Sequence, residues 1–298
     1  MLDNGLLKYY PQCFDEFGRL EIDKIKKKKE ELLGDNHRVV KFQHKRSLFS
    51  KDKSPTIYYE KSLGRNLGQN RGVQVDIADT EVLLSQIYAK AGLKTAIYLP
   101  TINKDNVLGV ISNEIKSSDS KSKLFFAELA DKAYESYKEP YDVGCKYTEK
   151  ELALQSYFKE KALKDYVTMH ILDVACGNTD RHDLNFFVDV VKDDNNLPVI
   201  QGIRLFDYGH GGMAYSNLFV NGLGNGRLKN KAEMIEEFKT NEYVNMFYTP
   251  TEMSEMLGNI NVVGTARDIK QTINYEIDDG LVTKFARLID DTAESLIK

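Results

Sequence analysis

Residues 177–185 read GNTDRHDLN and residues 206–212 read FDYGHGG, and these two polar stretches decide the fold. The first follows an apolar segment with helical spacing, which Gly177 is suited to end. Between the two stretches, LNFFVDVV and LPVIQGIRLF alternate as strands around the turn-forming KDDNN. The sequence therefore predicts a helix, a polar loop, and a hairpin that ends in a second polar turn.

Three oxygen-bearing side chains are expected to converge in this arrangement. Asp180 and Asn185 lie five residues apart on the loop, and Asp207 follows the hairpin. Taken alone, Asp180 would be an ordinary turn residue that bonds the local backbone. Carboxylate and amide oxygens are ligands that magnesium prefers, and D-x-x-x-x-N before D-x-G is the protein-kinase order. The set therefore favours phosphoryl transfer, in which one aspartate orients the acceptor hydroxyl and the other residues hold the metal.

The same residues resemble the HipA-like atypical kinases, which share their catalytic layout with phosphatidylinositol kinases. N-T-D-R-H-x-x-N-F spans residues 178–186 and is similar to the HipA-like catalytic loop, while F-D-Y-G resembles the metal-binding turn. The resemblance implies that Asp180 is the catalytic base and that Asn185 and Asp207 are metal ligands. It also implies that Arg181 and His182 shape the loop.

The order of elements predicts two parts of different character. Strand-like segments dominate up to the serine-rich SSDSKSK, and helical segments dominate after it, so a boundary is expected near residue 116. The resemblance implies an α+β, bilobal protein kinase-like fold. Residues 1–116 would form a small, β-rich, nucleotide-binding N-lobe with one main helix, and residues 117–298 a larger, mostly helical C-lobe.

Several elements of the first part are predicted from local patterns. Residues 22–33, IDKIKKKKEELL, are expected to form a charged surface helix. One hairpin is expected around SKDKSP at residues 50–55, and a second around NKDN at residues 103–106. A helix is expected to start at Asp79 as a polar cap and to stop at Gly92.

The nucleotide-binding residues of the first part are expected from the order strand, connector, helix. A kinase of this type needs a strand lysine, commonly held by a glutamate of the neighbouring helix. Lys61 and Glu81 fit this order, although a surface ion pair would fit as well. Lys41 in RVVKF is the competing lysine, and Lys61 is preferred because it lies closer to the helix.

The adenine and phosphate contacts are expected from two further segments. If VISNEI is the hinge strand, the backbone groups of Ile111, Ser112 and Asn113 meet the adenine edge. The sequence contains no orthodox glycine-rich loop. Either SKDKSP or residues 64–72, GRNLGQNRG, would then have to contact the phosphates.

Composition narrows the classes of partner. The 298 residues carry a net charge of −4, which argues against non-specific binding to nucleic acid or anionic lipid. No apolar stretch approaches eighteen residues and no basic-then-apolar leader is present, so a cytoplasmic protein without a membrane span is expected unless a dedicated machine secretes it. The three cysteines show no CxxC spacing, which predicts reduced thiols rather than zinc ligands or disulfides.

Three functions follow as hypotheses. The first, implied by the resemblance, is an ATP- and Mg²⁺-dependent serine/threonine kinase with a protein substrate, and it leaves room for a regulatory protein partner. The second keeps the chemistry and takes a lipid or small molecule as acceptor. The third is a nucleotide-binding pseudokinase or interaction module, which the missing glycine-rich loop favours and the intact metal residues oppose.

Overall fold

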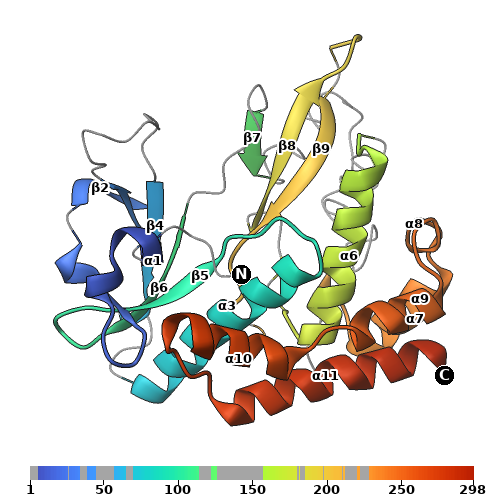
Figure 1. Cartoon of the computed structure of the whole chain (residues 1–298). Helices are drawn as coiled ribbons and strands as arrows, with labels where there is room; N and C mark the ends of the chain where they lie inside the picture. Colours follow the sequence, from blue (N-terminus) through green and yellow to red (C-terminus); the bar gives the residue numbers. More distant parts are fainter. Residues whose placement is uncertain are drawn as a thin grey trace. The chain divides into compact units, whose positions relative to one another are not determined.

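The computed structural model divides the chain into two compact units. Unit 1 comprises Met1–Ala89, Ala96–Ile115 and Asn261–Lys284, and unit 2 comprises Lys90–Thr95, Lys116–Ile260 and Phe285–Lys298 (Figure 1). Each unit is described by itself. The residues that the structure describes are 6–25, 27–33, 39–44, 57–64, 70–113, 122–125, 157–179, 181, 185–196, 198–209, 211, 220–221 and 228–298.

A six-stranded sheet forms the centre of unit 1, in the order β1-β5-β6-β4-β3-β2. The β1–β5 pair is parallel, and the other neighbours are antiparallel. Both predicted hairpins are confirmed, since β3 pairs with β4 and β5 with β6. The strands are β1 (Leu20–Glu21), β2 (Lys27–Leu33), β3 (Val39–His44), β4 (Ile57–Ser62), β5 (Tyr98–Ile102) and β6 (Leu108–Asn113).

The helix predicted over residues 22–33 is wrong. A short 3-10 helix, η2 (Ile22–Lys24), is followed by the strand β2, which pairs with β3. The apolar positions of this segment are too sparse to form a continuous helical stripe, so pairing with β3 overrides the local helix propensity. β2 lies at one edge of the sheet, where lysine-rich strands are common.

The main helix of unit 1 is α3 (Arg71–Lys90), and it starts eight residues before the predicted cap at Asp79. All residues from Ala78 to Tyr88 are buried, so this part of the helix is covered on every side. Gly92 follows with a φ of 88°, a left-handed conformation that suits glycine at a helix end. The predicted stop is therefore confirmed and the predicted start is wrong.

Segments from both ends of the chain complete unit 1. The N-terminal segment contributes α1 (Leu6–Tyr9) and the 3-10 helix η1 (Pro11–Cys13). The C-terminal segment Asn261–Lys284 contributes α10 (Val262–Ile273). Gly18 has a φ of 73°, and a Cβ atom there would lie 2.0 Å from the carbonyl oxygen of Ile273. Glycine is thus required where the N-terminal turn approaches the end of α10.

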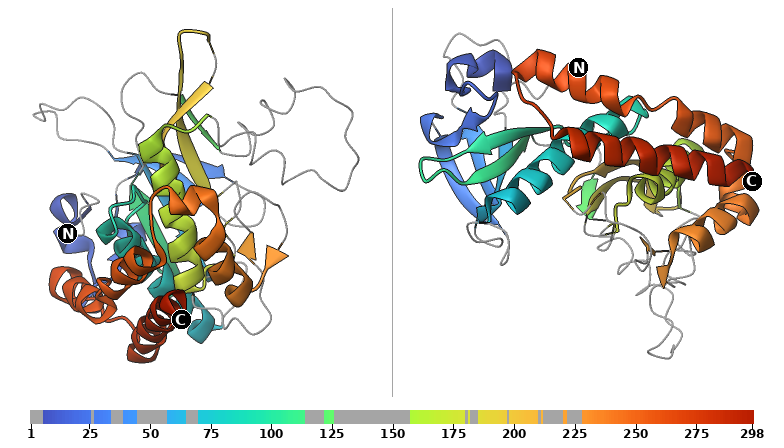
Figure 2. Two further views of the ribbon diagram at one scale, coloured as in Figure 1. Left: turned by 90° about the vertical axis from the view of Figure 1, so that its right-hand side faces the viewer. Right: turned by 90° about the horizontal axis from the view of Figure 1, so that it is seen from below.

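Unit 2 contains a three-stranded antiparallel sheet, in the order β7-β8-β9, with α6 packed along β9 (Figures 1 and 2). The predicted hairpin of residues 184–206 is confirmed as β8 and β9. A bidentate ion pair inside it joins Arg204 Nη2 to Asp189 Oδ2 at 2.6 Å and is almost fully buried. The elements are α6 (Glu160–Cys176), β7 (Ser122–Phe125), β8 (Phe186–Lys192) and β9 (Pro198–Leu205).

The rest of unit 2 is mainly helical, as the sequence predicts. α7 and α9 each begin with a capping box, formed by Asn230 with Glu233 and by Thr249 with Glu252. Among the described residues, no helix is long and apolar enough to cross a bilayer. The elements are β10 (Val220–Asn221), β11 (Leu228–Lys229), α7 (Lys231–Thr240), α8 (Glu242–Asn245) and α9 (Pro250–Gly258). The helix α11 (Asp279–Ile297) belongs to unit 2 from Phe285 onward.

Candidate active site

The polar loop of residues 177–185 begins at the end of α6, where Gly177 has a φ of 70°. This left-handed residue ends the helix as predicted. The next residue turns back onto α6, because the backbone N–H of Asn178 donates to the carbonyl of Asp173 at 2.9 Å. The Asn178 amide also donates to Asp173 Oδ1 at 2.7 Å, so a buried carboxylate fixes the start of the loop.

Arg181 ties this loop to the hairpin. Its Nε lies 3.1 Å from Asp173 Oδ2, and its Nη1 donates to the carbonyl oxygens of Asn185 at 2.9 Å and Phe206 at 2.8 Å. The guanidinium is buried, so its charge is compensated by the carboxylate and by carbonyl dipoles. Arg181 shapes the loop as the resemblance implies, and it links both polar stretches.

Asn185 directly precedes β8, and Asp207 follows β9 by one residue, so both lie at the open end of the β8–β9 hairpin. Phe186 is paired with Leu205, and the N–H of Phe206 donates to the carbonyl of Asn185 at 3.4 Å. Asp207 follows with a φ of 60°, a left-handed conformation that aspartate tolerates better than most residues. Such conformations cluster at functional sites. The hairpin thus bonds Asn185 to the residue before Asp207, and the shared metal site stays a prediction.

The donor chemistry of this pair fits a hard divalent cation. Asn185 offers an amide oxygen and Asp207 a carboxylate, and both are oxygen ligands of the kind that magnesium takes alongside substrate phosphates. Among the described residues, no cluster of three His, Cys, Asp or Glu side chains offers another metal site. Asp180 and His182 lie outside the described residues, so their roles stay predictions.

Unit 1 holds a buried ion pair at the predicted lysine. Lys61 Nζ on β4 lies 3.1 Å from Glu81 Oε1 on α3. The Glu81 side chain is 0% exposed and that of Lys61 is 14% exposed. The pair is therefore largely buried, and the Lys61 ammonium compensates the charge of the buried Glu81 carboxylate. Its contact with nucleotide phosphates stays a prediction.

Lys41, the competing lysine, projects from the same face of the sheet as Lys61. Lys41 is paired with Tyr59 in the antiparallel ladder, and directly opposed residues share a face. Tyr59 and Lys61 are two residues apart on β4, so they also share a face. The choice between the two lysines thus depends on Glu81, which contacts Lys61.

The hinge residues occupy the middle of the sheet. β6 has β5 on one side and β4 on the other, and Ile111 and Ser112 are paired on both sides. The backbone N–H and C=O groups of these two residues are therefore engaged in hydrogen bonding within the sheet. The β5 pairing ends at Ser112, whereas Asn113 pairs with Tyr58 of β4. Of the three predicted adenine contacts, the strand geometry favours Asn113 and disfavours Ile111 and Ser112.

Sequence reasoning missed Asp173 and Asn178 as supports of the site. Asp173 interrupts the apolar run of α6 between Leu172 and Val174, and it is 2% exposed. A charged residue in a buried helical stripe is the signal that could have indicated a structural partner. Cys176, two residues before Asn178, is also buried. Burial raises the pKa of its thiol, which disfavours the reactive thiolate form.

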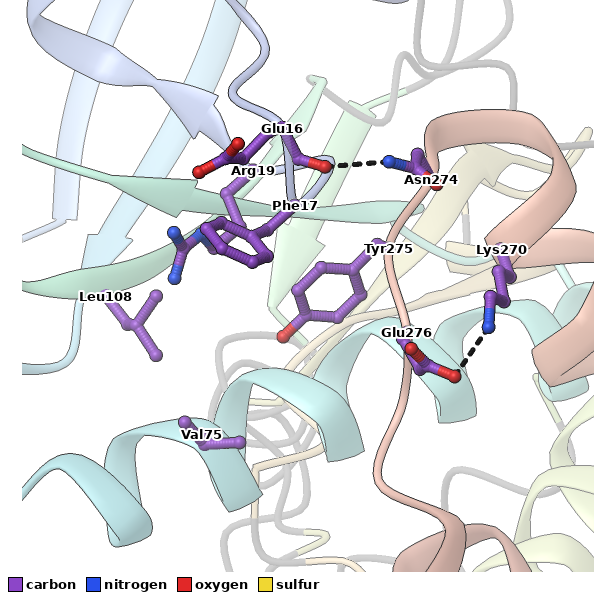
Figure 3. A pocket seen from close by; sticks show the side chains of 9 residues that line it. All are labelled: Glu16, Phe17, Arg19, Val75, Leu108, Lys270, Asn274, Tyr275 and Glu276. Carbon is purple, nitrogen blue, oxygen red and sulfur yellow. Dashed lines mark hydrogen bonds and ion pairs between the residues drawn. The ribbon is translucent and has the colours of Figure 1, made fainter.

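A separate cavity of about 300 Å³ lies in unit 1, beneath the N-terminal turn (Figure 3). Polar groups on its wall pair with one another: Asn274 Nδ2 donates to the Glu16 carbonyl at 2.7 Å, and Lys270 Nζ donates to Glu276 Oε1 at 2.5 Å. Tyr275 forms the floor, and its hydroxyl donates to Asp79 Oδ1 at 2.5 Å. The cavity marks the junction between the N-terminal turn and the segment after α10.

Comparison with known proteins defines the class of fold. No family model matches the sequence, and no curated protein is similar to it. The structure, in contrast, is that of a protein kinase-like fold, with an N-terminal β-sheet and helix followed by a mostly helical region. The predicted α+β kinase-like fold is therefore confirmed.

Two solved structures are similar to the chain. The first is the Helicobacter pylori proinflammatory kinase CtkA, with a TM-score of 0.60 and 13% sequence identity over 93% of this chain and 95% of that chain. The second is HipA of Shewanella oneidensis MR-1, solved with HipB and operator DNA, with a TM-score of 0.40 and 10% identity over 93% of this chain and 67% of that chain. The likeness to CtkA, at 13% identity, shows the fold alone, and the activity must be argued from the residues.

Proposed function

We propose that the protein is an ATP- and Mg²⁺-dependent phosphotransferase that transfers the γ-phosphate to the hydroxyl group of a serine or threonine in a protein. The buried Lys61–Glu81 ion pair is the observation that carries this proposal. A strand lysine held by a helix glutamate is one of the recurring parts of protein kinases. The neighbouring backbone positions of Asn185 and Asp207 and the kinase-like fold support the same conclusion.

Each residue has a distinct role in the proposed reaction. Lys61, oriented by Glu81, binds phosphate oxygens of ATP, while Asn185 and Asp207 hold magnesium. Magnesium supplies charge neutralisation at the phosphates. Asp180 accepts the proton of the acceptor hydroxyl as the oxygen of that hydroxyl bonds to the γ-phosphorus and the bond from phosphorus to the bridging oxygen breaks, which releases ADP.

The acceptor class is tested by a transfer assay with γ-labelled ATP and magnesium. The protein is incubated separately with mixed protein substrates, phosphoinositide vesicles and small hydroxylated metabolites. We expect label on serine or threonine of protein, identified by mass spectrometry. Label confined to lipid or metabolite would replace the protein-kinase assignment by a kinase of another acceptor.

The same samples separate an enzyme from a pseudokinase. Calorimetry measures ATP binding with and without magnesium, and intact mass measures phosphate added to the protein itself. Magnesium-dependent binding together with transfer is the expected result. Binding without transfer to any acceptor would show a nucleotide-binding module, and the absence of both would remove the proposed function altogether.

A further inference from the structure

The connector between α3 and β5 is bonded to the end of β9. Lys90–Thr95 belongs to unit 2, although α3 up to Ala89 belongs to unit 1. Thr95 forms a parallel bridge with Leu205, and the N–H of Leu205 donates to the Lys94 carbonyl at 2.9 Å. This contact lies two residues before Asp207, which the proposed function makes a metal ligand.

The hydroxyl of Thr95 makes two hydrogen bonds to the residues around Asp207. Its Oγ1 donates to the carbonyl of Leu205 at 3.3 Å, and it also shares a hydrogen bond with the hydroxyl of Tyr208. Tyr208 is fully buried, and the Arg181 guanidinium lies 5.1 Å from the centre of its ring. The side chain that follows Asp207 is therefore held both by the connector and by Arg181.

Asp207 is thus flanked by two anchors. On the side of the polar loop, Arg181 and Asn185 bond the carbonyl and the N–H of Phe206. On the side of the connector, Thr95 bonds Leu205 and Tyr208. The left-handed backbone of Asp207, with a φ of 60°, is less favourable for a free chain than an extended one. Anchors on both neighbours are what such a conformation needs to persist.

We propose that Thr95 is a positioning residue for the metal-binding turn: its hydroxyl, together with that of Tyr208, fixes the backbone that orients the Asp207 carboxylate. This inference rests on the proposed function. It assigns a role to a residue that lies far from both polar motifs in the sequence and acts through Leu205 and Tyr208. Its expected signature is a change in magnesium dependence rather than in fold.

The test compares Thr95→Val with Thr95→Ser and with a matched control, Thr168→Val. Thr168 has the same chemistry elsewhere in unit 2: its Oγ1 donates to the Lys164 carbonyl at 2.7 Å and shares a hydrogen bond with the Tyr248 hydroxyl at 2.8 Å. Each variant is titrated with magnesium at fixed ATP, well below its melting temperature. The quantity measured is the magnesium concentration that gives half-maximal ATP binding.

Thr95→Val is expected to raise this concentration about tenfold, because the hydrogen bonds from Thr95 to the Leu205 carbonyl and to the Tyr208 hydroxyl are lost. Thr95→Ser and Thr168→Val are expected to match the wild type. Equal magnesium dependence in Thr95→Val and Thr168→Val would overturn the inference. If Thr95→Val does not fold, Tyr208→Phe replaces it in the test. We expect Tyr208→Phe to raise the magnesium concentration for half-maximal ATP binding by a smaller factor. An unchanged concentration would contradict the inference. A wild-type protein without magnesium-dependent ATP binding would instead remove the proposed function, and this inference with it.

Discussion

Lys61 and Lys41 present a choice that sequence spacing leaves open. Both project from one face of the unit 1 sheet, on neighbouring strands. The contact with Glu81 favours Lys61, because a fully buried carboxylate lies 3.1 Å from its ammonium group, and the assignment stays a prediction. A buried glutamate on α3 would be costly without this partner, so the pair is maintained as a unit.

The first prediction at the residue scale separates the two lysines. Removing Lys61 alone would take a positive charge away from the buried Glu81 carboxylate, so the variant is the neutral pair Lys61→Met with Glu81→Gln. Phosphate transfer is expected to fall by about 100-fold or more, since a cation that stabilises the transferring phosphoryl group is lost.

Lys41→Met serves as the matched control, and we expect it to retain most of its transfer rate. Circular dichroism checks that both variants fold. The assignment would be reversed if Lys41→Met lost transfer and the neutral pair kept it.

At this scale, motif order predicted Asn185 and Asp207 as metal ligands, and this role stays a prediction; the structure bonds Asn185 to Phe206, the residue before Asp207. The supports of the site could not be predicted in the same way. Asp173 and Asn178 act through contacts that depend on the left-handed turn at Gly177, and Thr95 acts through a bridge to a residue 110 positions away. Asp173 leaves a signal as a charged residue within an apolar run, but the identity of its partners and the contacts of Thr95 leave no local pattern in the sequence.

At the scale of elements, α3 is tied to the segment between α10 and α11. Asp79 accepts hydrogen bonds from the Tyr275 hydroxyl at 2.5 Å and from the N–H of Asp278 at 2.9 Å. Burial raises the pKa of Asp79 to about 6, although these hydrogen bonds oppose the rise. Burial also raises the pKa of Tyr275, so its hydroxyl remains a donor at neutral pH. The carboxylate expected to cap α3 instead joins two distant segments of unit 1.

This raised pKa predicts a pH dependence of stability. Asp79 binds its proton more tightly in the folded state, with a pKa of about 6 against an ordinary 3.8. Its contribution to the free energy of unfolding therefore falls as pH rises from about 4 to about 6 and is constant above that. Over this window the change is at most about 3 kcal/mol, because each pKa unit corresponds to about 1.4 kcal/mol.

Asp79→Asn cannot titrate and should lack this fall. Urea denaturation gives the free energy of unfolding of the wild type and of Asp79→Asn at each pH between 4 and 7. The difference between the two free energies should change as the pH rises from about 4 to about 6. Parallel curves for the two proteins across this range would show that Asp79 does not titrate as argued.

The elements differ in how well the sequence predicts them. The β5–β6 and β8–β9 hairpins were predicted because their turns carry asparagine, and Asn106 and Asn196 adopt φ values of 61° and 65° there. β2 was not predicted, because its strand state depends on pairing with β3 rather than on its own charged sequence. The start of α3 was placed too late, because Asp79 resembles a cap and its real partners come from residues 275 and 278.

At the scale of the whole molecule, the kinase-like fold is shared with CtkA at only 13% identity. The fold could still be predicted, because the order of polar loop, hairpin and second polar turn in residues 177–212 is a short pattern. Such a pattern can be recognised even where the rest of the sequence has little identity to known kinases. The expected boundary near residue 116, between a nucleotide-binding N-lobe and a C-lobe, stays a prediction. Unit 1 also includes Asn261–Lys284, a segment whose association with the sheet depends on tertiary contacts such as that between Asn274 and Glu16.

The central claim is that Asp207 helps to hold a magnesium ion on which ATP binding depends, whereas Asp180 acts only in transfer. Calorimetry of ATP binding with magnesium tests it on Asp207→Asn and Asp180→Asn, and asparagine also tolerates the left-handed φ of 60° at position 207. We predict that Asp207→Asn weakens binding by about 100-fold or more, whereas Asp180→Asn keeps wild-type affinity and loses transfer. Wild-type affinity in Asp207→Asn, or an equal loss of affinity in both variants, would contradict the account.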